Sequence, residues 1–397
     1  MDYILEKFKN NDMLSILIGG DVCPTYANLD KFEEGKARDI LPEKYFKLIQ
    51  NADFSIVNVE CPLTKEFIPI TKIGPALKAS PLSVNLFKTL GVTAVCLANN
   101  HILDYGDKGL EDTLKVYYNA GIQTVGAGIR LKDARVPLIQ RFPCGRSIGV
   151  VAMAENEFSI AGKDSPGANP IDFVNYTIIR DLKKNINKVL VILHAGTEMR
   201  CIPRPGLIDL CHFLIEEGAD AVIVQHTHCV GGVEYYNNAP IVYGQGNFIF
   251  GKIYKNEIKP QIWWEGMLVE INWENANNNL SLQLHPFLQS PDHMGIRLLT
   301  EFEEEEFRKK QYYFSEIINN RDTIERSWQN YCSISRDTVL LNLMGASRIP
   351  RGLAYRGLPL IKIWLKMFEF NRVRNMISCE SHRELVLDVL KSLQKPF

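Results

Sequence analysis

The chain alternates short apolar runs, rich in β-branched residues, with segments whose apolar residues recur at helical spacing. Short apolar runs bounded by glycine or polar residues are typical of buried strands. The predicted strands are SILIGG (15–20), FSIVNV (54–59), TAVCLA (93–98), IGVVAMA (148–154), KVLVILH (188–194) and ADAVIVQ (219–225). Helices are predicted over 81–91, 107–121 and 204–220. Glycines suited to capping lie near their C-terminal ends, at Gly91, Gly121 and Gly218. This alternation predicts an α/β architecture with largely buried central sheets.

The pattern changes after about residue 240. Strands with short turns, typical of an antiparallel sheet edge, are predicted over 241–250, 266–274 and 280–287. From about residue 300 the chain is charged and helical in spacing, and helices are predicted over 301–320, 336–345, 358–373 and 381–394. We therefore divide the chain into a main α/β domain over 13–300 and a C-terminal helical region over 301–397.

Composition narrows the class of protein. The chain has 397 residues, 46% hydrophobic and 23% charged, which is an ordinary globular composition. Its formal net charge of −1 gives no sign of a broadly basic surface, so we expect no nucleic-acid partner. Nine cysteines without CxxC spacing indicate a reduced protein. Without a secretory leader, or the roughly 18 apolar residues of a membrane span, we expect a cytoplasmic protein. The oligomeric state is left open.

The stretch AVIVQHTHCVGGVE (221–234) ends an apolar run in two histidines, one residue apart. Side chains on a strand alternate between faces, so His226 and His228 are expected side by side at the strand end. Imidazole is the commonest metal ligand in proteins. Because a histidine in this position could equally cap a loop, the pair alone does not decide between the two interpretations.

The other predicted strands end in similar residue types. Ligands of open α/β sheets bind beyond the carboxyl ends of the strands. The polar residues that follow these ends are Asp21, Glu60, Asn99, Asn100, His101, His194, His226 and His228. Each of them alone could be a turn former, a surface residue or a hydrogen-bonded core residue. Their joint occurrence at equivalent topological positions favours a metal site.

The ligand types indicate which metals would bind. Imidazole and carboxylate groups without thiolate clusters suit Zn, Mn or Fe better than Ca or Mg. The six candidate ligands are Asp21, Glu60, Asn100, His194, His226 and His228. They exceed the needs of one tetrahedral ion and could hold two divalent ions with a bridging carboxylate. Two metals about 3.5–4 Å apart serve phosphoryl chemistry, because they activate water and neutralise charge on the attacked phosphate.

Several motifs together resemble one protein family. They are GGDVCP, NVECPLT, LANNHILDYGDKGLEDTL, LHAGTE, GADAVIVQHTHCVGGVE and YGQGNFIF, in this order within residues 13–252. The set is similar to the bacterial capsule-synthesis CapA (poly-γ-glutamate biosynthesis) family, which resembles the calcineurin-like metallophosphoesterases in fold. The resemblance implies a four-layer α/β/β/α metallophosphoesterase-like sandwich with a dimetal site between loops. The C-terminal helical extension lies outside it.

The resemblance also implies residue roles. Asp21 and His228 would bind the first ion, and Glu60 stands where an aspartate usually bridges. The ligands implied for the second ion are Asn100, His194 and His226. His101 would donate a proton to the leaving group. Asp104 would orient His101, or instead cap the following helix.

The sequence departs from the phosphoesterase pattern in its first motif. Asp21-Val22-Cys23 places a cysteine where these enzymes commonly carry a histidine, and Cys23 either ligates weakly or only packs. The bridging position carries the longer Glu60. We therefore expect the first ion to be held less well than the second.

Further candidates concern an anionic substrate. Lys72 and Lys78 could face such a substrate, or be solvated loop lysines. Glu198, Arg200 and Arg204 follow His194 and are expected at the pocket rim, since arginine grips carboxylate or phosphate. Asn247 is expected to shape a loop near the site.

Three functions are compatible with these residues. The first is a metal-dependent hydrolase of phosphomonoesters or phosphodiesters in capsule, polyglutamate or envelope polymer metabolism. The second is a non-hydrolytic component that binds an anionic polymer such as polyglutamate during capsule synthesis or export. The third is metal-dependent hydrolysis of an amide bond, which the fold permits.

Overall fold

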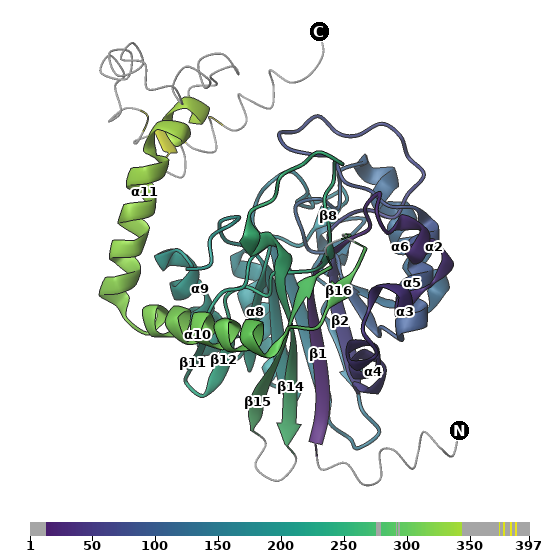
Figure 1. Cartoon of the computed structure of the whole chain (residues 1–397), viewed down its shortest axis with the longest axis horizontal. Helices are drawn as coiled ribbons and strands as arrows, with labels where there is room; N and C mark the ends of the chain where they lie inside the picture. Colours follow the sequence, from purple (N-terminus) through teal and green to yellow (C-terminus); the bar gives the residue numbers. More distant parts are fainter. Residues whose placement is uncertain are drawn as a thin grey trace. The chain divides into compact units, whose positions relative to one another are not determined.

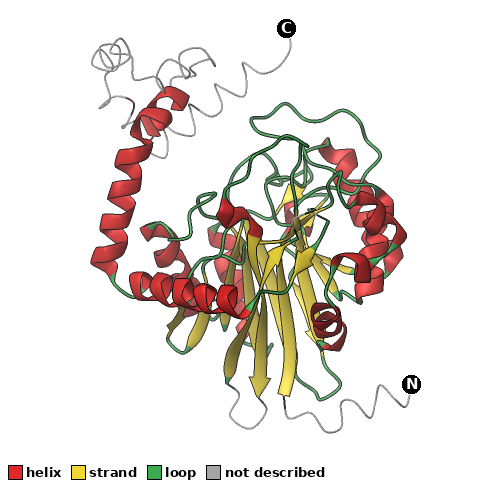
Figure 2. Cartoon of the chain, viewed as in Figure 1, coloured by secondary structure: helices red, strands yellow, loops and turns green. Residues whose placement is uncertain are grey.

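The computed structural model describes residues 13–343 apart from 275–278, 291 and 293, together with Val373, Met376, Ile377, His382 and Val386. The chain forms two compact units, Met1–Trp328 and Gln329–Phe397. The first unit contains two large mixed β-sheets and most of the described helices (Figures 1 and 2). No helix in the described part of the chain is long and apolar enough to cross a membrane.

The first sheet has the order β16-β15-β14-β1-β2-β3-β4, and β13 also pairs with β1. Its parallel strands are β1 (Met13–Cys23), β2 (Phe54–Val59), β3 (Ala94–Cys96), β4 (Gln123–Val125) and β13 (Asn247–Phe250). Its antiparallel part consists of β14 (Glu265–Glu274), β15 (Leu280–Gln289) and β16 (Ile296–Arg297).

The second sheet has the order β11-β12-β10-β9-β7-β6. Its parallel centre consists of β7 (Ser147–Ala154), β9 (Lys188–His194), β10 (Ala221–Gln225) and β12 (Ala239–Val242). The antiparallel edges are β6 (Leu138–Arg141) and β11 (Val233–Tyr236). A small separate sheet pairs β5 (Ala127–Gly128) with β8 (Gly167–Ala168).

Helices cover the outer faces of the two large sheets. Beside the first sheet lie α2 (Leu29–Glu34), α3 (Ala37–Ile40), α4 (Glu43–Asn51), η1 (Pro81–Ser83), α5 (Val84–Leu90) and α6 (Gly106–Ala120). The second sheet packs against α8 (Phe173–Lys183) and α9 (Pro205–Glu216). The remaining helical elements are α7 (Leu131–Ala134), η2 (Gln261–Trp264), α10 (Glu301–Ile318) and α11 (Arg321–Leu343).

Alternation along β9 reveals the layers. Leu190 and Ile192 belong to the core that the two sheets share. Val191 and Leu193, on the opposite face, pack in a second core with residues of α9 such as Leu207. Successive strand residues point to opposite faces, so this sheet lies between the first sheet and a helical layer. The predicted four-layer α/β/β/α sandwich is confirmed.

Most of the predicted elements are present. β2 and β9 have the predicted bounds, α5 and α9 lie within the predicted helices, and α6 begins and ends one residue before the predicted helix 107–121. Gly91 and Gly121 cap their helices with φ of 72°, whereas Glu217 caps α9 and Gly218 follows it. The helices α4 and α8 were not predicted. The predicted helices 358–373 and 381–394 lie outside the continuously described residues, and the division at residue 300 stays a prediction.

Candidate metal centre

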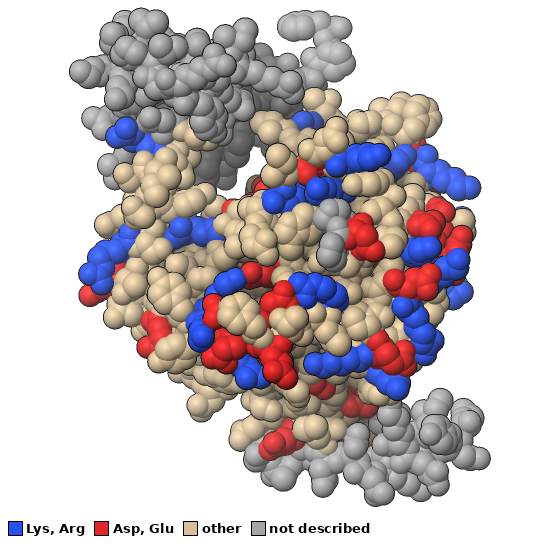
Figure 3. Space-filling model, viewed as in Figure 1, with Lys and Arg blue, Asp and Glu red and all other residues tan. Residues whose placement is uncertain are grey.

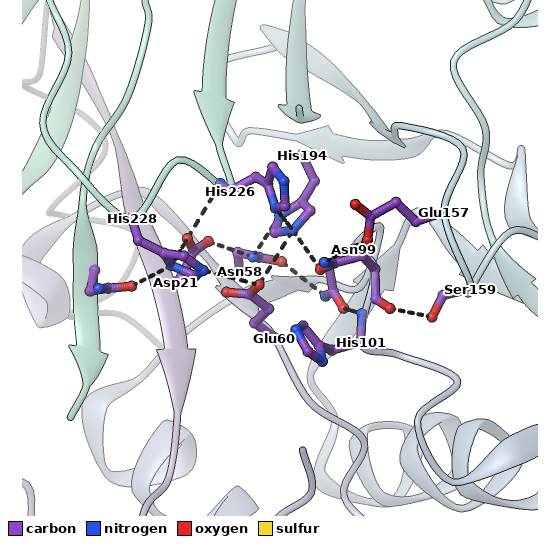
Figure 4. A network of polar contacts seen from close by, with 12 residues as sticks. Asp21, Asn58, Glu60, Asn99, His101, Glu157, Ser159, His194, His226 and His228 are labelled. Carbon is purple, nitrogen blue, oxygen red and sulfur yellow. Dashed lines mark hydrogen bonds and ion pairs between the residues drawn. The ribbon is translucent and has the colours of Figure 1, made fainter. Parts of the chain in front are cut away.

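The carboxyl ends of five parallel strands meet between the two sheets and carry the predicted ligands. Asp21 lies in β1, Glu60 directly follows β2, and Asn100 follows β3 in a turn. His194 ends β9, and the two remaining histidines follow β10. All six predicted ligand side chains are buried, at 7% exposure or less. Figure 4 shows them around one centre.

Glu60 is shared by two groups of potential ligands. One consists of Glu60, His194 and His226, and the other of Asp21, Glu60 and His228. Within each group the ligand atoms lie within 4.8 Å of one another. Glu60 Oε1 lies 3.4 Å from His194 Nε2 and 3.8 Å from His228 Nε2. The carboxylate therefore lies between the two groups of potential ligands.

Glu60 is also the least satisfied polar side chain of the centre. It is 0% exposed, and neither of its oxygens has a hydrogen-bond partner in the described structure. Burial and the charge of Asp21 raise its pKa to about 8. Buried polar atoms normally have partners, because leaving one unpaired costs free energy. Two unpaired oxygens facing imidazoles and a second carboxylate fit a site for divalent cations.

The histidines differ in their readiness to bind a metal. Burial lowers the pKa of His194 to about 4, and burial together with the charges of His194 and His228 lowers that of His226 to about 3. Both are therefore neutral near pH 7, the form that coordinates metals. Burial opposes the charged form of His228, but the charge of Glu60 and the hydrogen bond to Asp21 raise its pKa to about 9. The Asp21 pKa falls to about 2, because contacts with His228 and His194 outweigh burial.

The backbone at His226 and His228 does not have the extended strand conformation that the sequence analysis assumed. β10 ends at Gln225, and His226 and His228 have φ of 86° and 52°. Non-glycine residues rarely adopt this left-handed conformation, which is often strained and concentrates at functional sites. The explanation by strand alternation is therefore wrong. The two rings nevertheless face the same centre, with centroids 6.2 Å apart.

A close approach of backbones places Asp21. The register of β1 against β2 shifts between Gly19 and Asp21, an irregularity that re-aims side chains. Gly20 lies directly against the loop before β13, where a Cβ would come within 2.2 Å of the Gly246 carbonyl oxygen. Only glycine fits at this position without displacing the backbone that carries the ligand.

Two asparagine side chains support the ligands: Asn99, which the sequence placed at a strand end, and Asn58, which it did not single out. Asn58 donates to Asp21 Oδ1 at 2.6 Å and lies 3.3 Å from His194 Nδ1. Asn99 donates to Asn58 Oδ1 and to the Val59 carbonyl. An asparagine inside the largely apolar FSIVNV strand was the available signal for Asn58. Partners of this kind fix the orientation of metal ligands.

Glu157 fixes the amide of Asn100. Asn100 Nδ2 donates to Glu157 Oε2 at 3.0 Å, and Ser159 Oγ donates to the Asn100 carbonyl at 2.7 Å. Asn100 Oδ1 consequently faces His194 Nε2, 3.0 Å away. On the other side, Asn247 Oδ1 lies 2.9 Å from His228 Nδ1. No sequence signal identified Glu157, which lies in a loop without periodicity.

His101 and Asp104 form a pair beside the centre. His101 Nδ1 donates to Asp104 Oδ2 at 2.6 Å, which leaves Nε2 as the free ring nitrogen. Lys72 also donates to Asp104, and its Nζ lies 3.0 Å from His101 Nδ1. The Lys72 side chain is only 3% exposed, so the solvated-lysine alternative is wrong. Lys72 supports the His101–Asp104 pair from behind.

Three of the four other predicted substrate residues have partners away from the ligands. Lys78 donates to the Glu66 carbonyl, Arg204 pairs with Glu155, and Arg200 donates to Ser327. Glu198 is exposed and raises the pKa of Glu60 through its charge, although burial and Asp21 have larger effects. A role for these four residues in substrate binding stays a prediction.

Cys23 is buried in β1 beside Cys61. Its contact with Cys61, followed by burial, raises the pKa of the Cys23 thiol well above its ordinary value. Its Sγ donates to the Pro24 carbonyl at 3.7 Å, and it lies in neither ligand group. Among the described residues Cys23 packs, and it does not replace the histidine of the phosphoesterase motif.

The fold and the site define the chain as a four-layer α/β/β/α sandwich with a buried centre of carboxylate, imidazole and amide groups, which contains two groups of potential metal ligands. Its sequence identifies the family. The chain belongs to the bacterial capsule synthesis proteins described as PGA_cap, whose family model matches residues 15–252. The family predicted from the motifs is therefore confirmed.

Three curated relatives illustrate the similarity. The PGA biosynthesis protein CapA of Bacillus subtilis is 29% identical over 62% of this chain and 65% of its own length. The capsule biosynthesis protein CapA of Bacillus anthracis is 28% identical over 62% and 61%. A probable polyglutamine synthesis accessory protein of Mycobacterium tuberculosis is 29% identical over 50% and 55%. The chain thus spans less than two thirds of the length of each relative.

Solved structures are more distant. The calcineurin-like phosphoesterase YfkN from Bacillus subtilis is similar over 78% of this chain and 99% of that chain, with 13% identity and a TM-score of 0.42. The 5′-nucleotidase from Candida albicans covers 77% of this chain with a TM-score of 0.41. Likenesses at this level carry no argument about activity.

Proposed function

We propose that this protein is a metal-dependent phosphoesterase that acts on an anionic substrate in capsule or polyglutamate biosynthesis. The observation that supports this most directly is the buried Glu60 carboxylate, shared by two ligand groups and without hydrogen-bond partners. Two bound Mn, Fe or Zn ions would supply an activated water and neutralise charge on the attacked phosphate. The CapA relatives, which are named for PGA and capsule biosynthesis, support the biological context.

Residues of this chain would hold the ions, donate a proton to the leaving group and position the ligands. Glu60 would bridge the ions, with Asp21 and His228 on one side. The ligands on the other side would be Asn100, His194 and His226. His101 would give a proton from Nε2 to the leaving oxygen, because Asp104 accepts the hydrogen bond of Nδ1 and fixes the ring. The amides of Asn58 and Asn247 would hold the ligands in place.

One observation supports a second candidate function. Cys23 packs away from the ligand groups, so the Asp21 side of the centre lacks a histidine that phosphoesterases commonly have. A weakly held first ion would favour a non-hydrolytic protein that binds an anionic polymer. Calorimetry with polyglutamate distinguishes this function, since it predicts tight binding without turnover. Product analysis on glutamyl peptides would detect the amide hydrolase.

The decisive experiment combines metal loading with turnover. Protein purified without chelating resin should contain Mn, Fe or Zn at one to two ions per chain, and should hydrolyse an aryl phosphomonoester or phosphodiester. His194→Ala should lose metal and turnover together. His212→Ala is the matched control, because His212 pairs with Glu234 away from the centre. Full metal loading without turnover on any such ester would overturn the phosphoesterase proposal.

A further inference from the structure

Two loops beyond the strand ends carry large apolar side chains into solvent. We name residues 64–80 and 251–260 the mouth loops, and in Figure 1 both lie beyond the upper ends of the strands. Their exposed apolar side chains are Phe67 (78%), Ile68 (68%), Ile73 (85%), Tyr254 (62%) and Ile258 (94%). Single exposed apolar residues are normal on a protein surface, whereas a group of them at one edge marks an interaction site.

The first mouth loop is attached to the candidate metal centre at its base. The Ile70 amide donates to the Asp104 carbonyl at 2.9 Å, and the Leu77 amide donates to Asp104 Oδ2 at 2.6 Å. Lys72 donates to the same carboxylate. The carboxylate that orients His101 therefore also fixes the stem of a loop with an apolar tip.

Residues of both mouth loops act on Tyr105. The Lys78 ammonium of the first loop lies 4.6 Å from the centre of the Tyr105 ring. Burial and the charges of Asp104 and of Tyr254, in the second loop, raise the pKa of Tyr105. Since both loops also lie beyond the same ends of the strands (Figure 1), the two apolar tips belong to one edge of the molecule.

Lysines accompany the apolar tips. Lys65 and Lys255 are exposed, and with Lys252 they form no ion pair among the described residues. Figure 3 shows basic side chains on the upper part of the face that it draws. Protruding apolar side chains among unpaired lysines match an anionic lipid surface, which offers an apolar phase beneath negative headgroups. A soluble polyanion would pair with the lysines but would leave the apolar side chains in water.

We propose that the mouth loops dock this protein onto the surface of an anionic phospholipid bilayer. Phe67, Ile73 and Ile258 enter the headgroup region, and Lys65 and Lys255 contact lipid phosphates. Docking presents the metal centre to substrates at the bilayer surface. The docking goes beyond the proposed phosphoesterase function and requires neither bound metal nor turnover.

The test is flotation of the full-length protein with vesicles of phosphatidylcholine alone or mixed equally with phosphatidylglycerol. The protein should float with the mixed vesicles only, and less at high salt. Phe67→Ser with Ile258→Ser should weaken binding at least about tenfold, because two large apolar side chains no longer leave water. Lys65→Glu with Lys255→Glu should weaken it about tenfold or more.

Matched controls lie in α5 and in the C-terminal half of α6, outside the mouth loops. Tyr118→Ser removes a side chain 84% exposed near the C-terminal end of α6, and Lys88→Glu with Lys115→Glu reverses as many charges on α5 and α6. These variants should float like the wild type, and thermal melts show that all variants fold. Failure to float, equal flotation with both lipids, or equal losses in the controls would each overturn the proposal. Chelator-treated protein should float as well as untreated protein. Flotation therefore tests the docking independently of the phosphoesterase proposal, and a failure of one can be told from a failure of the other.

Discussion

Replacing Glu60 by glutamine separates the metal-binding role of this side chain from its effect on stability. Glutamine keeps the shape of the side chain but carries no charge at any pH. Both ligand groups share Glu60, so the substitution should remove metal from both halves of the centre. The metal-free variant should nevertheless be more stable than the metal-free wild type at alkaline pH, because it buries no carboxylate.

The pKa shift of Glu60 sets the magnitude. In the folded protein without metal, burial and then Asp21 raise this pKa from 4.5 to about 8. The unfolded chain loses the proton near pH 4.5 and the folded chain keeps it until about pH 8, so stability falls with pH across this window. At about 1.4 kcal/mol per pH unit, the loss reaches roughly 3 kcal/mol at pH 7 and roughly 5 kcal/mol above pH 8. Glutamine removes this dependence.

Urea denaturation of chelator-treated protein at pH 5, 7 and 8.5, together with elemental analysis, measures both effects. Glu270→Gln is the matched control, because Glu270 accepts hydrogen bonds from Ser15 and His285 and its pKa is lowered. Its carboxylate stabilises the fold above the unfolded pKa, so this control should lose stability and keep its metal. The reasoning is refuted if Glu60→Gln retains two ions, or if it is less stable than metal-free wild type at pH 8.5.

Other perturbations test the remaining parts of the centre. His101→Ala should keep its metal while turnover of an aryl phosphoester falls about 10²–10⁴-fold, and loss of metal would contradict its role as proton donor. Glu157→Ala should lower metal affinity about 10–100-fold in chelator competition, and unchanged affinity would exclude a positioning role. Gly20→Ala should destabilise the protein by roughly 2 kcal/mol or more in urea, because the new Cβ would meet the Gly246 carbonyl oxygen. Metal affinity should rise about tenfold between pH 7 and 9 as Glu60 loses its proton, and calorimetry in several buffers should detect proton release.

The strand ends could be predicted from the sequence because apolar runs are a local signal. The parallel direction of the strands then brings their carboxyl ends together. Apolar runs located β2, β9 and β10, and their carboxyl ends meet because parallel strands share a direction. Glu60 and His194 followed directly from that rule. The buried central sheets followed in the same way, since runs that are apolar on both faces must be covered on both faces, whereas the four layers were implied by the resemblance to the family.

The supports of the ligands could not be predicted, because their roles depend on contacts between distant segments. Asn100 orients its amide through Glu157, 57 residues further along the chain. His226 and His228 converge through left-handed backbone, which no pattern of apolar residues encodes. From the sequence alone Lys72 could be a solvated loop lysine, whereas in the structure its ammonium group donates to Asp104.

The two halves of the centre are unequal, and the cause lies in a single residue of the first motif. The half with His194 and His226 has two imidazoles already neutral near pH 7, and the Asn100 amide oxygen faces it. The other half has one imidazole, His228, whose pKa near 9 requires a proton to leave before it can coordinate a metal. A histidine at position 23 would have added a ligand there, whereas the buried Cys23 thiol stays protonated beside Cys61. The half with His194 and His226 should therefore fill first, with Glu60 already in place to bind the ion that follows.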